Sequence, residues 1–263
     1  MKQAAFYERP VRAVGRLWED WAEHGGQLGL LVWSTAVAAV RLRISSREFV
    51  RQLYVMGVQS IPIVAVTSIL TGIVTSQQGG YQFTATIPLY VLGSVTVTSV
   101  VLELAPVLTA VVLVGRVGAR ITAELGTMVV SEQIDAYRSL GRDPVIMLAA
   151  PRILAGLVVM PLLVGLSNII GIFSGMVAAQ LSLGLSFETF LYGARLFWHS
   201  WDLFYSFMKA VAFGFAIPVI AIHMGFRTTG GAEGVGRTTT ASVMFQTLTI
   251  LILDALFPPL FLQ

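Results

Sequence analysis

Residues 103–152 read ELAPVLTAVVLVGRVGARITAELGTMVVSEQIDAYRSLGRDPVIMLAAPR. The stretch begins inside an apolar segment, leaves it between Gly115 and Arg120, and enters a second apolar segment at Pro144. Proline suits the first turn of a helix, because the N–H that it lacks would have no partner there. The pattern therefore predicts two membrane helices joined by a polar amphipathic helix over residues 120–141, placed to contact something in the water.

The composition of the chain is that of a membrane protein. Of its 263 residues, 56% are hydrophobic and 12% are charged, and the mean hydropathy is +0.78. A soluble domain has about 25% charged residues. We therefore predict an all-α polytopic membrane protein. The chain has no cysteine, which excludes disulfides, thiolate nucleophiles and cysteine metal sites.

Five apolar segments are long enough to cross a bilayer, which takes about 20 helical residues. We place these spans at about residues 53–77, 88–115, 144–179, 202–224 and 240–262. Pro62 and Gly72 are expected to weaken the first span. Gly171 and Gly175 form a G-x-x-x-G pair in the third, which favours close helix packing, here within the subunit.

The remaining segments are predicted to lie at the membrane surfaces. Residues 1–26 carry too many charges for a signal peptide and are predicted to form an interfacial amphipathic helix. Residues 28–40 are too few to span the bilayer and are interpreted as an elbow helix. The aromatic segment 181–201 is typical of an outer interfacial helix, with a core stripe as the alternative. The glycine-rich stretch 227–240 is predicted to be a loop.

The arginines indicate how the chain is oriented. With the N-terminus in the cytoplasm and five spans, nearly all arginines fall on the cytoplasmic side, Arg195 lies outside, and Lys209 lies within a span. This asymmetry follows the positive-inside rule. The pI near 9.4 is therefore a sign of membrane topology and predicts no nucleic-acid partner.

The sequence contains no recognisable enzyme site. The only lysines are Lys2 and Lys209, and neither stands in a G-x-x-x-x-G-K-[ST] motif, so ATP hydrolysis would need a separate subunit. The three histidines are scattered outside any metal-binding pattern. The sequence therefore predicts a non-catalytic membrane subunit with no metal and no cofactor.

Three ionisable residues are predicted to lie at membrane depth: Glu103, Lys209 and Asp254. Each costs about 2.5–3.5 kcal/mol at the centre of a membrane helix on insertion scales. We expect a network around Lys209, which forms either a polar wall or gate of a lipid-headgroup cavity or an ion pair that orients helices. Leu70 on the first span and Tyr81 after it are candidates for lining an acyl-chain cavity, with ordinary core or lipid-facing positions as the alternative.

Five motifs of the quoted stretch, ELAPVLTA, GRVGARITAELGTM, SEQIDA, GRDP and APR, resemble in order and spacing the MlaE/YrbE permeases. The resemblance extends from RQLYVMGVQSIPIV, which begins at Arg51, to TTTASVMFQTLTILILDAL near the end of the chain. It implies an N-terminal part over residues 1–46 and a permease domain over 47–263. Two positions depart from the family pattern: Leu102 replaces an arginine and Ala105 a glycine. The first departure moves the expected headgroup contact to Lys209.

The resemblance implies that the polar helix 120–141 is a coupling helix that docks into a groove of an ATPase subunit. Glu124, Glu132, Gln133, Asp135 and Arg116 are the residues assigned to that contact. By composition alone, a solvated loop helix explains the same charges. The glycines of this region, Gly115, Gly118, Gly126 and Gly141, would permit sharp turns at its ends.

The family further implies the partners. It predicts a homodimer in the bacterial inner membrane, two copies of an ABC ATPase subunit, and a periplasmic MCE-domain protein, with phospholipid or a related lipid passing between them. An ATP-independent secondary carrier or channel, with an ion relay through the three intramembrane charges, is the main alternative. A third hypothesis is that the chain is a membrane scaffold that transports nothing.

Overall fold

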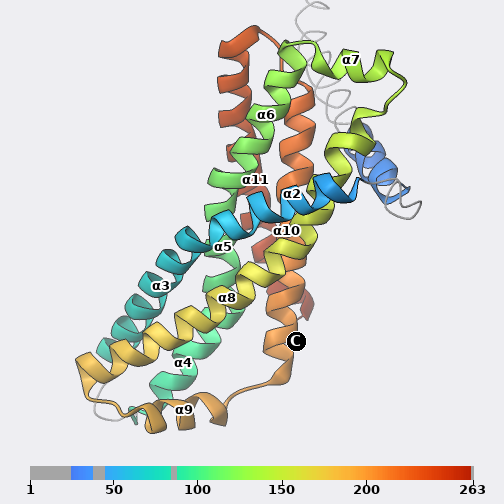
Figure 1. The fold of residues 1–263 in the computed structure, drawn as a ribbon. Helices are drawn as coiled ribbons and strands as arrows, with labels where there is room; N and C mark the ends of the chain where they lie inside the picture. The colour runs from blue at the N-terminus through green and yellow to red at the C-terminus, as the bar shows by residue number, and fades with distance from the viewer. Residues whose placement is uncertain (1–24, 38–44, 84–87, 262–263) are drawn as a thin grey trace, which may run out of the picture.

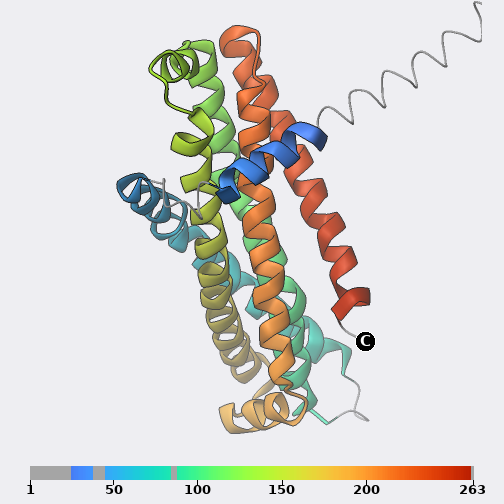
Figure 2. The same ribbon diagram turned by 90° about the vertical axis from the view of Figure 1, so that its right-hand side faces the viewer.

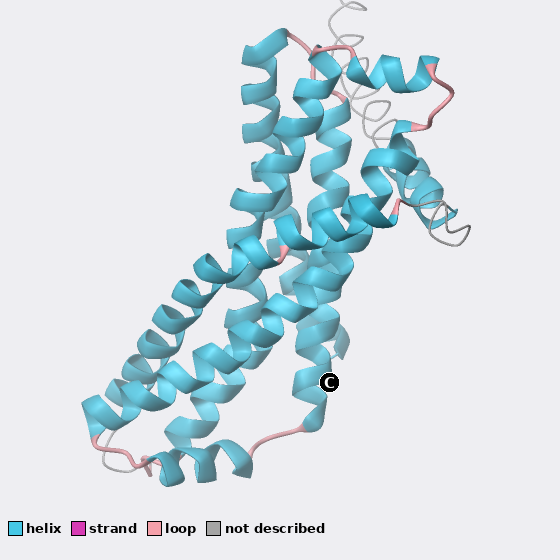
Figure 3. Ribbon diagram, in the orientation of Figure 1, coloured by secondary structure: helices cyan, strands magenta, loops and turns pink. Residues whose placement is uncertain are grey.

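The computed structural model describes residues 25–37, 45–83 and 88–261. Every regular element in these ranges is helical (Figure 3). Five helical stretches are long and apolar enough to cross a membrane: Ser46–Gln82, Val91–Val130, Val145–Leu183, Ser200–Phe226 and Gly231–Phe261. The prediction of an all-α polytopic protein with five spans is confirmed. The interfacial helix predicted within residues 1–26 lies almost entirely outside the described residues, and the elbow region is helical over 25–37.

The first two spans comprise α2 Ser46–Met56, the 3₁₀-helical segment η1 Val58–Ser60, α3 Ile61–Gln82, α4 Val91–Ser99, the π-helical segment η2 Val100–Leu104, α5 Ala105–Leu113, the π-helical segment η3 Val114–Gly118 and α6 Ala119–Val130. The elements that follow are α7 Gln133–Ser139, the π-helical segment η4 Val145–Ala149, α8 Ala150–Leu183, α9 Phe187–Leu196, α10 Ser200–Phe226 and α11 Gly231–Phe261.

The second span is the longest, with 40 residues from Val91 to Val130. At about 1.5 Å per residue it measures about 60 Å, twice the roughly 30 Å thickness of the hydrocarbon core. Part of it therefore extends beyond the bilayer. Helix α7 and the α10–α11 turn lie at one end of the bundle, the α7 end, and α9 lies at the other (Figure 1, Figure 2).

The predicted polar helix 120–141 is two helices in the structure. Helix α6 continues the second span without a break to Val130, and the chain then turns at Glu132, whose φ of 58° is left-handed. Gly141, with φ of 67°, follows the end of α7 and makes a turn as expected. Gly126 makes none, because it lies inside α6, where a Cβ would come 2.7 Å from the Thr228 hydroxyl.

One predicted boundary was wrong, and one helical stretch begins before the span predicted within it. The helical stretch of the first span begins at Ser46, ahead of the predicted start near residue 53, and bends at Gly57. Pro62 then lies in the first turn of α3, where proline is tolerated. Helix α11 begins at Gly231, so most of the predicted loop 227–240 is helical. Its threonines remain in the helix by donating to carbonyls one turn earlier, as Thr239 does to Val235 at 2.7 Å.

Small residues at every fourth position let α3 and α8 approach closely. The buried face of α3 consists of Val64, Ser68, Gly72, Ser76 and Gly80. Opposite it on α8 lie Gly171 and Gly175, and the hydroxyls of Ser68 and Ser167 are 2.7 Å apart. Such a stripe is how membrane helices gain van der Waals contact without a hydrophobic driving force. The prediction that the G-x-x-x-G pair packs within the subunit is confirmed.

Changing Gly72 to alanine should destabilise the protein by about 1–3 kcal/mol, the usual cost of overpacking. The added Cβ would come within 2.0 Å of the Gly171 carbonyl oxygen, and backbone cannot move aside as a flexible side chain can. The measurement is the thermal unfolding midpoint in a mild detergent. Gly115→Ala is the control, because a Cβ there meets nothing within 4 Å. Equal midpoints for the two variants would contradict the packing argument.

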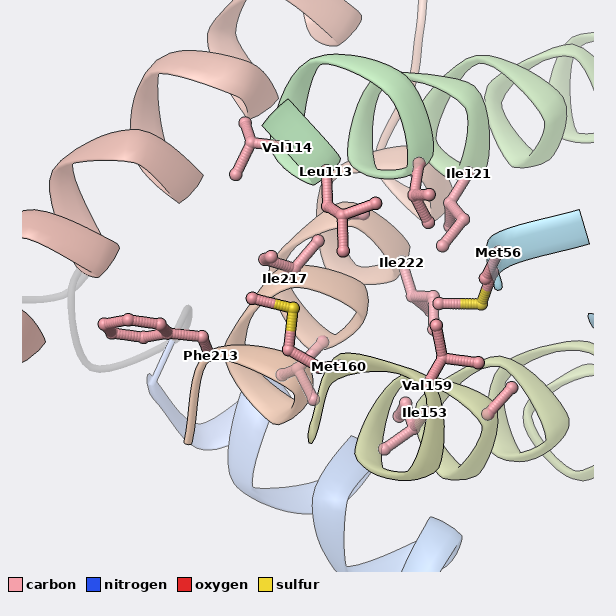
Figure 4. Close-up of a cluster of buried hydrophobic side chains, with 14 of the residues drawn as sticks. Met56, Leu113, Val114, Ile121, Ile153, Val159, Met160, Phe213, Ile217 and Ile222 are labelled. Atoms are coloured by element: carbon pink, nitrogen blue, oxygen red, sulfur yellow. The ribbon is translucent and has the colours of Figure 1, made fainter. Parts of the chain in front are cut away.

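Helix α10 lies at the centre of the bundle and packs against α8, α11 and α6. The main apolar core gathers around it, with Leu113, Met160 and Ile217 converging from three different elements (Figure 4). Met56, at the end of α2, reaches the same cluster. The core thus fixes α10 against α5, α6 and α8, and leaves α3 and α11 at the periphery.

Candidate functional site

The three intramembrane charges meet in one cluster. The Lys209 ammonium on α10 lies 2.6 Å from Glu103 Oε2 on η2 and 2.5 Å from Asp254 Oδ1 on α11. By helical rise, Lys209 is about 14 Å from the start of α10 at the α9 end, which places the cluster well inside the span. The expected network around Lys209 is present, and it joins three helices distant in sequence.

The third partner of Lys209 is a backbone carbonyl that a proline leaves without its helical hydrogen bond. Pro106 has no N–H, so the carbonyl of Leu102, four residues earlier, loses its normal helical donor. Lys209 Nζ donates to that carbonyl oxygen at 3.2 Å. An ammonium has three N–H donors. Here it donates to the Glu103 carboxylate and the Leu102 carbonyl, and it forms an ion pair with the Asp254 carboxylate.

The cluster is buried at its positive centre and open at its negative edge. The Lys209 side chain is fully buried, while the side chains of Glu103 and Asp254 are 42% and 23% exposed. The Tyr205 ring covers the ammonium on another side, with its centroid 5.3 Å from Nζ. With both carboxylates ionised the cluster carries one net negative charge, and its accessible groups are carboxylate oxygens.

A polar junction ties the same three helices together nearer the α7 end. The Thr122 hydroxyl on α6 is 2.8 Å from that of Ser242 on α11 and 3.1 Å from the Ala221 carbonyl oxygen on α10. Gln246 Nε2 donates to Ser242 at 2.7 Å. From Glu103 to Thr122 the helix rises about 28 Å. Two polar ties this far apart should make the three helices move together.

A second ionic network holds α6 to α8 and α2. Arg152 on α8 is 1% exposed and lies 2.8 Å from the Glu124 carboxylate, while Arg51 on α2 lies 3.8 Å from it. Arg152 also donates to the Leu148 carbonyl at 2.6 Å, and Arg51 pairs with Glu48 at 2.9 Å. Buried Arg152 anchors this network, and the charge pattern of the α6–α7 region did not identify it.

The residues assigned to an ATPase contact separate into two groups. Glu132, Gln133 and Asp135 are exposed together at the turn between α6 and α7 and at the start of α7. Glu124 is paired with Arg152 within the bundle, and Arg116 lies on η3, about 24 Å of helix before Glu132. Only the first group therefore forms a continuous surface at the α7 end, which we name the α7 tip.

The two apolar site candidates lie on a different helix from the cluster. Leu70 and Tyr81 are both on α3, and Tyr81 is 93% exposed. They belong to the outward face of α3, opposite the stripe that packs on α8. The structure thus assembles Glu103, Lys209 and Asp254, and leaves Leu70 and Tyr81 on a separate apolar surface.

Sequence reasoning missed Pro106, Tyr205 and the Thr122–Ser242–Gln246 junction. The only sequence signal for the role of Pro106 was its position three residues after the intramembrane Glu103. Hydroxyl and amide side chains are common in membrane helices, so nothing marked the junction residues. No three His, Asp or Glu side chains gather as a possible metal site anywhere in residues 25–37, 45–83 and 88–261.

The comparisons with known proteins agree with this architecture. The family model described as "Permease MlaE" matches residues 49–259. A "probable ABC transporter permease protein" of Rickettsia felis is 33% identical over 96% of this chain and 98% of its own length. A protein of the same description from Synechocystis is 38% identical over 80% of each chain. The "intermembrane phospholipid transport system permease protein MlaE" of Haemophilus influenzae is 30% identical over 93% of this chain and 94% of its own.

Proposed function

This chain belongs to the MlaE permease family, and on that premise we propose that it is the membrane subunit of an ABC transporter for phospholipid or a related lipid. The observation that carries the proposal is the Glu103–Lys209–Asp254 cluster, a charged group within the spans whose carboxylates are accessible. Intramembrane charges often mark a pathway for a substrate or an ion. The helix that carries Glu103 continues to the α7 tip, so one rigid element links the cluster to the water.

The energy source is an ABC ATPase, in two copies, bound at the α7 end. Its contact is the α7 tip, where Glu132, Gln133 and Asp135 offer carboxylates and an amide to a cleft lined by donors. Movement of the tip passes along α6 to the Thr122 junction and from there to the charged cluster. In this arrangement, Glu124 holds α6 to α8 through Arg152, and its contribution to coupling is positional.

The lipid path lies between two copies of the chain. A two-fold dimer suits a subunit with one coupling element, because each copy then receives one ATPase. The peripheral helices α3 and α11 have wide exposed apolar faces for this purpose, including Val66, Leu70, Val74, Phe245, Leu248 and Ile252. Acyl chains would pass along these faces, and headgroups past the exposed Glu103.

The membrane is the bacterial inner membrane, with the α7 end and the N-terminus in the cytoplasm. Among the described residues, Arg138, Arg142, Arg227 and Arg237 lie at or near the α7 end, while Arg195 lies on α9. This asymmetry supports the orientation by the positive-inside rule. An MCE-domain protein would then sit at the α9 end, in the periplasm. The ion-relay carrier is not favoured, because the relatives are named as ABC transporter permeases.

The proposal is tested by affinity purification of the full chain from native membranes in a mild detergent. Mass spectrometry of the eluate should recover a P-loop ATPase, an MCE-domain protein and bound phospholipid, and the mass of the complex should contain two copies of this chain. Mock purification from membranes lacking the tagged chain is the control. Reproducible recovery of the chain without any ATPase would overturn the proposal and favour the ATP-independent carrier with an ion relay.

A further inference from the structure

A recess lies between α2, η3 and α6. Its η3 and α6 side is lined by Arg116, Val117, Arg120, Ile121 and Glu124, and its α2 side by Gln52, Val55 and Met56. Neither the charged cluster nor the α7 tip includes these residues. The recess therefore places two guanidinium groups beside apolar side chains, as a binding site for an amphiphile requires. It has no role in the function described so far.

The depth of the recess matches the headgroup layer of a bilayer. The helix rises about 20 Å from Glu103 to Arg116 and about 25 Å to Arg120. Glu103 lies near the middle of the apolar run that begins at Val91. The hydrocarbon core ends about 15 Å from the bilayer centre, and the headgroup region ends about 20–22 Å from it. Arg116 thus lies among the phosphates of the leaflet at the α7 end, and Arg120 lies just outside them.

The charges around the recess leave two arginines without an acidic partner. Glu124 also faces the recess, but its carboxylate is held by Arg152 at 2.8 Å and by Arg51 at 3.8 Å. No ion pair or hydrogen bond engages the side chain of Arg116 or Arg120 within the described part of the chain. One terminal nitrogen of Arg116 is buried and lacks an acceptor there. A buried guanidinium N–H without an acceptor is unfavourable, so the site favours an anion.

We propose that this recess binds the phosphate group of a phospholipid from the leaflet at the α7 end. Guanidinium groups hold phosphate through paired, charge-assisted hydrogen bonds, and Arg116 and Arg120 lie one helical turn apart on the same face. Val55 and Met56 meet the glycerol and the first methylene groups of the acyl chains. The lipid links α2 to α6 beside the Arg51–Glu124–Arg152 network and is separate from any lipid held at the cluster.

The test is lipid retention by the purified, delipidated full chain, titrated with phosphatidylglycerol and read by native mass spectrometry. Arg120→Gln should raise the lipid concentration for half-occupancy of one site about tenfold, the effect of one lost charge-assisted contact. Arg116→Gln combined with Arg120→Gln should abolish that site. Arg142→Gln is the matched control, because Arg142 is exposed at the α7 end and outside the recess. It should bind like the wild type.

Three further arms identify the ligand chemistry. Diacylglycerol, which lacks the phosphate, should not occupy the site, and millimolar glycerol phosphate should not displace phosphatidylglycerol. The double Arg→Lys variant retains both charges but loses the paired guanidinium donors, so it should bind less tightly than the wild type and more tightly than the double Arg→Gln variant. Equal retention by Arg120→Gln and Arg142→Gln would overturn the proposal, as would binding of diacylglycerol. Displacement by glycerol phosphate would identify a site for soluble phosphates instead.

The measurement is independent of the proposed transport function. It uses neither ATPase nor MCE protein, so absence of those partners leaves it intact. Glu103→Gln separates the two lipid sites: it should leave the recess occupied. If Glu103→Gln removes the same lipid as Arg120→Gln does, then the lipid sits at the cluster and the recess is not a site. Arg120 is exposed, so its single variant is expected to fold.

Discussion

Replacing Lys209 with methionine should destabilise the protein by about 3–5 kcal/mol, the usual cost of breaking a buried ion pair from one side. The change leaves the partly exposed carboxylates of Glu103 and Asp254 beside one another with no positive charge between them. It also leaves the Leu102 carbonyl without a donor, since Pro106 cannot supply one. The measurement is the unfolding midpoint of the purified chain in detergent, followed by tryptophan fluorescence.

The control for this prediction removes all three charges at once. The triple variant Glu103→Gln, Lys209→Met, Asp254→Asn has no uncompensated carboxylate, so it should recover most of the lost stability. Replacing a whole buried ion cluster with neutral groups is often nearly neutral for stability. A Lys209→Met variant that melts with the wild type would show that the carboxylates do not need the ammonium, and would refute the role assigned to the cluster.

Reversing two charges at the α7 tip should abolish binding of the ATPase and cut lipid transport to less than about a tenth, since charge pairs at interfaces contribute about 1.5–7 kcal/mol of coupling. The change is Glu132→Arg with Asp135→Arg. Both side chains are exposed, and Asp135 has only a surface pair with Arg138 at 3.1 Å. The unfolding midpoint should therefore change little. The measurements are co-purification of the ATPase and transport in proteoliposomes.

Two control variants separate charge from shape at the tip. Glu188→Arg makes the same kind of reversal on α9, at the opposite end of the bundle, and should leave ATPase binding unchanged. Glu132→Asn removes the charge while suiting the left-handed backbone, which asparagine adopts more readily than glutamate. It should weaken binding partly. Wild-type binding by the double reversal would remove the α7 tip from the interface.

The long elements of the fold were predictable because their signal is apolar length, which a membrane demands of every span. The breaks were not. Glu132 takes a left-handed backbone, which glycine adopts most readily, so no glycine in the sequence indicated the turn between α6 and α7. The early start of α11 was missed because its glycines and threonines suggest a loop, although these residues are also compatible with a packed membrane helix.

The sequence identified most residues of the charged cluster and of the α7 tip, but it predicted only some of the contacts between them. Three charges in apolar segments must find partners, which is why Lys209 could be placed with Glu103 and Asp254. Glu124 shows the limit of this reasoning. Its position in a polar stretch suggested an exposed contact, but Arg152 lies across from it on α8 and is almost completely buried. A residue's partner on another helix depends on how helices rotate in packing, which neither charge nor periodicity specifies.

The full occupancy of the Lys209 ammonium has a consequence for how the cluster can work. Three oxygen atoms already lie within 3.2 Å of it, so an anionic headgroup cannot simply be added to it. The headgroup must first displace a carboxylate, and when it leaves, that carboxylate returns. Under the proposed function, lipid capture at this position would be an exchange of two anions on one cation.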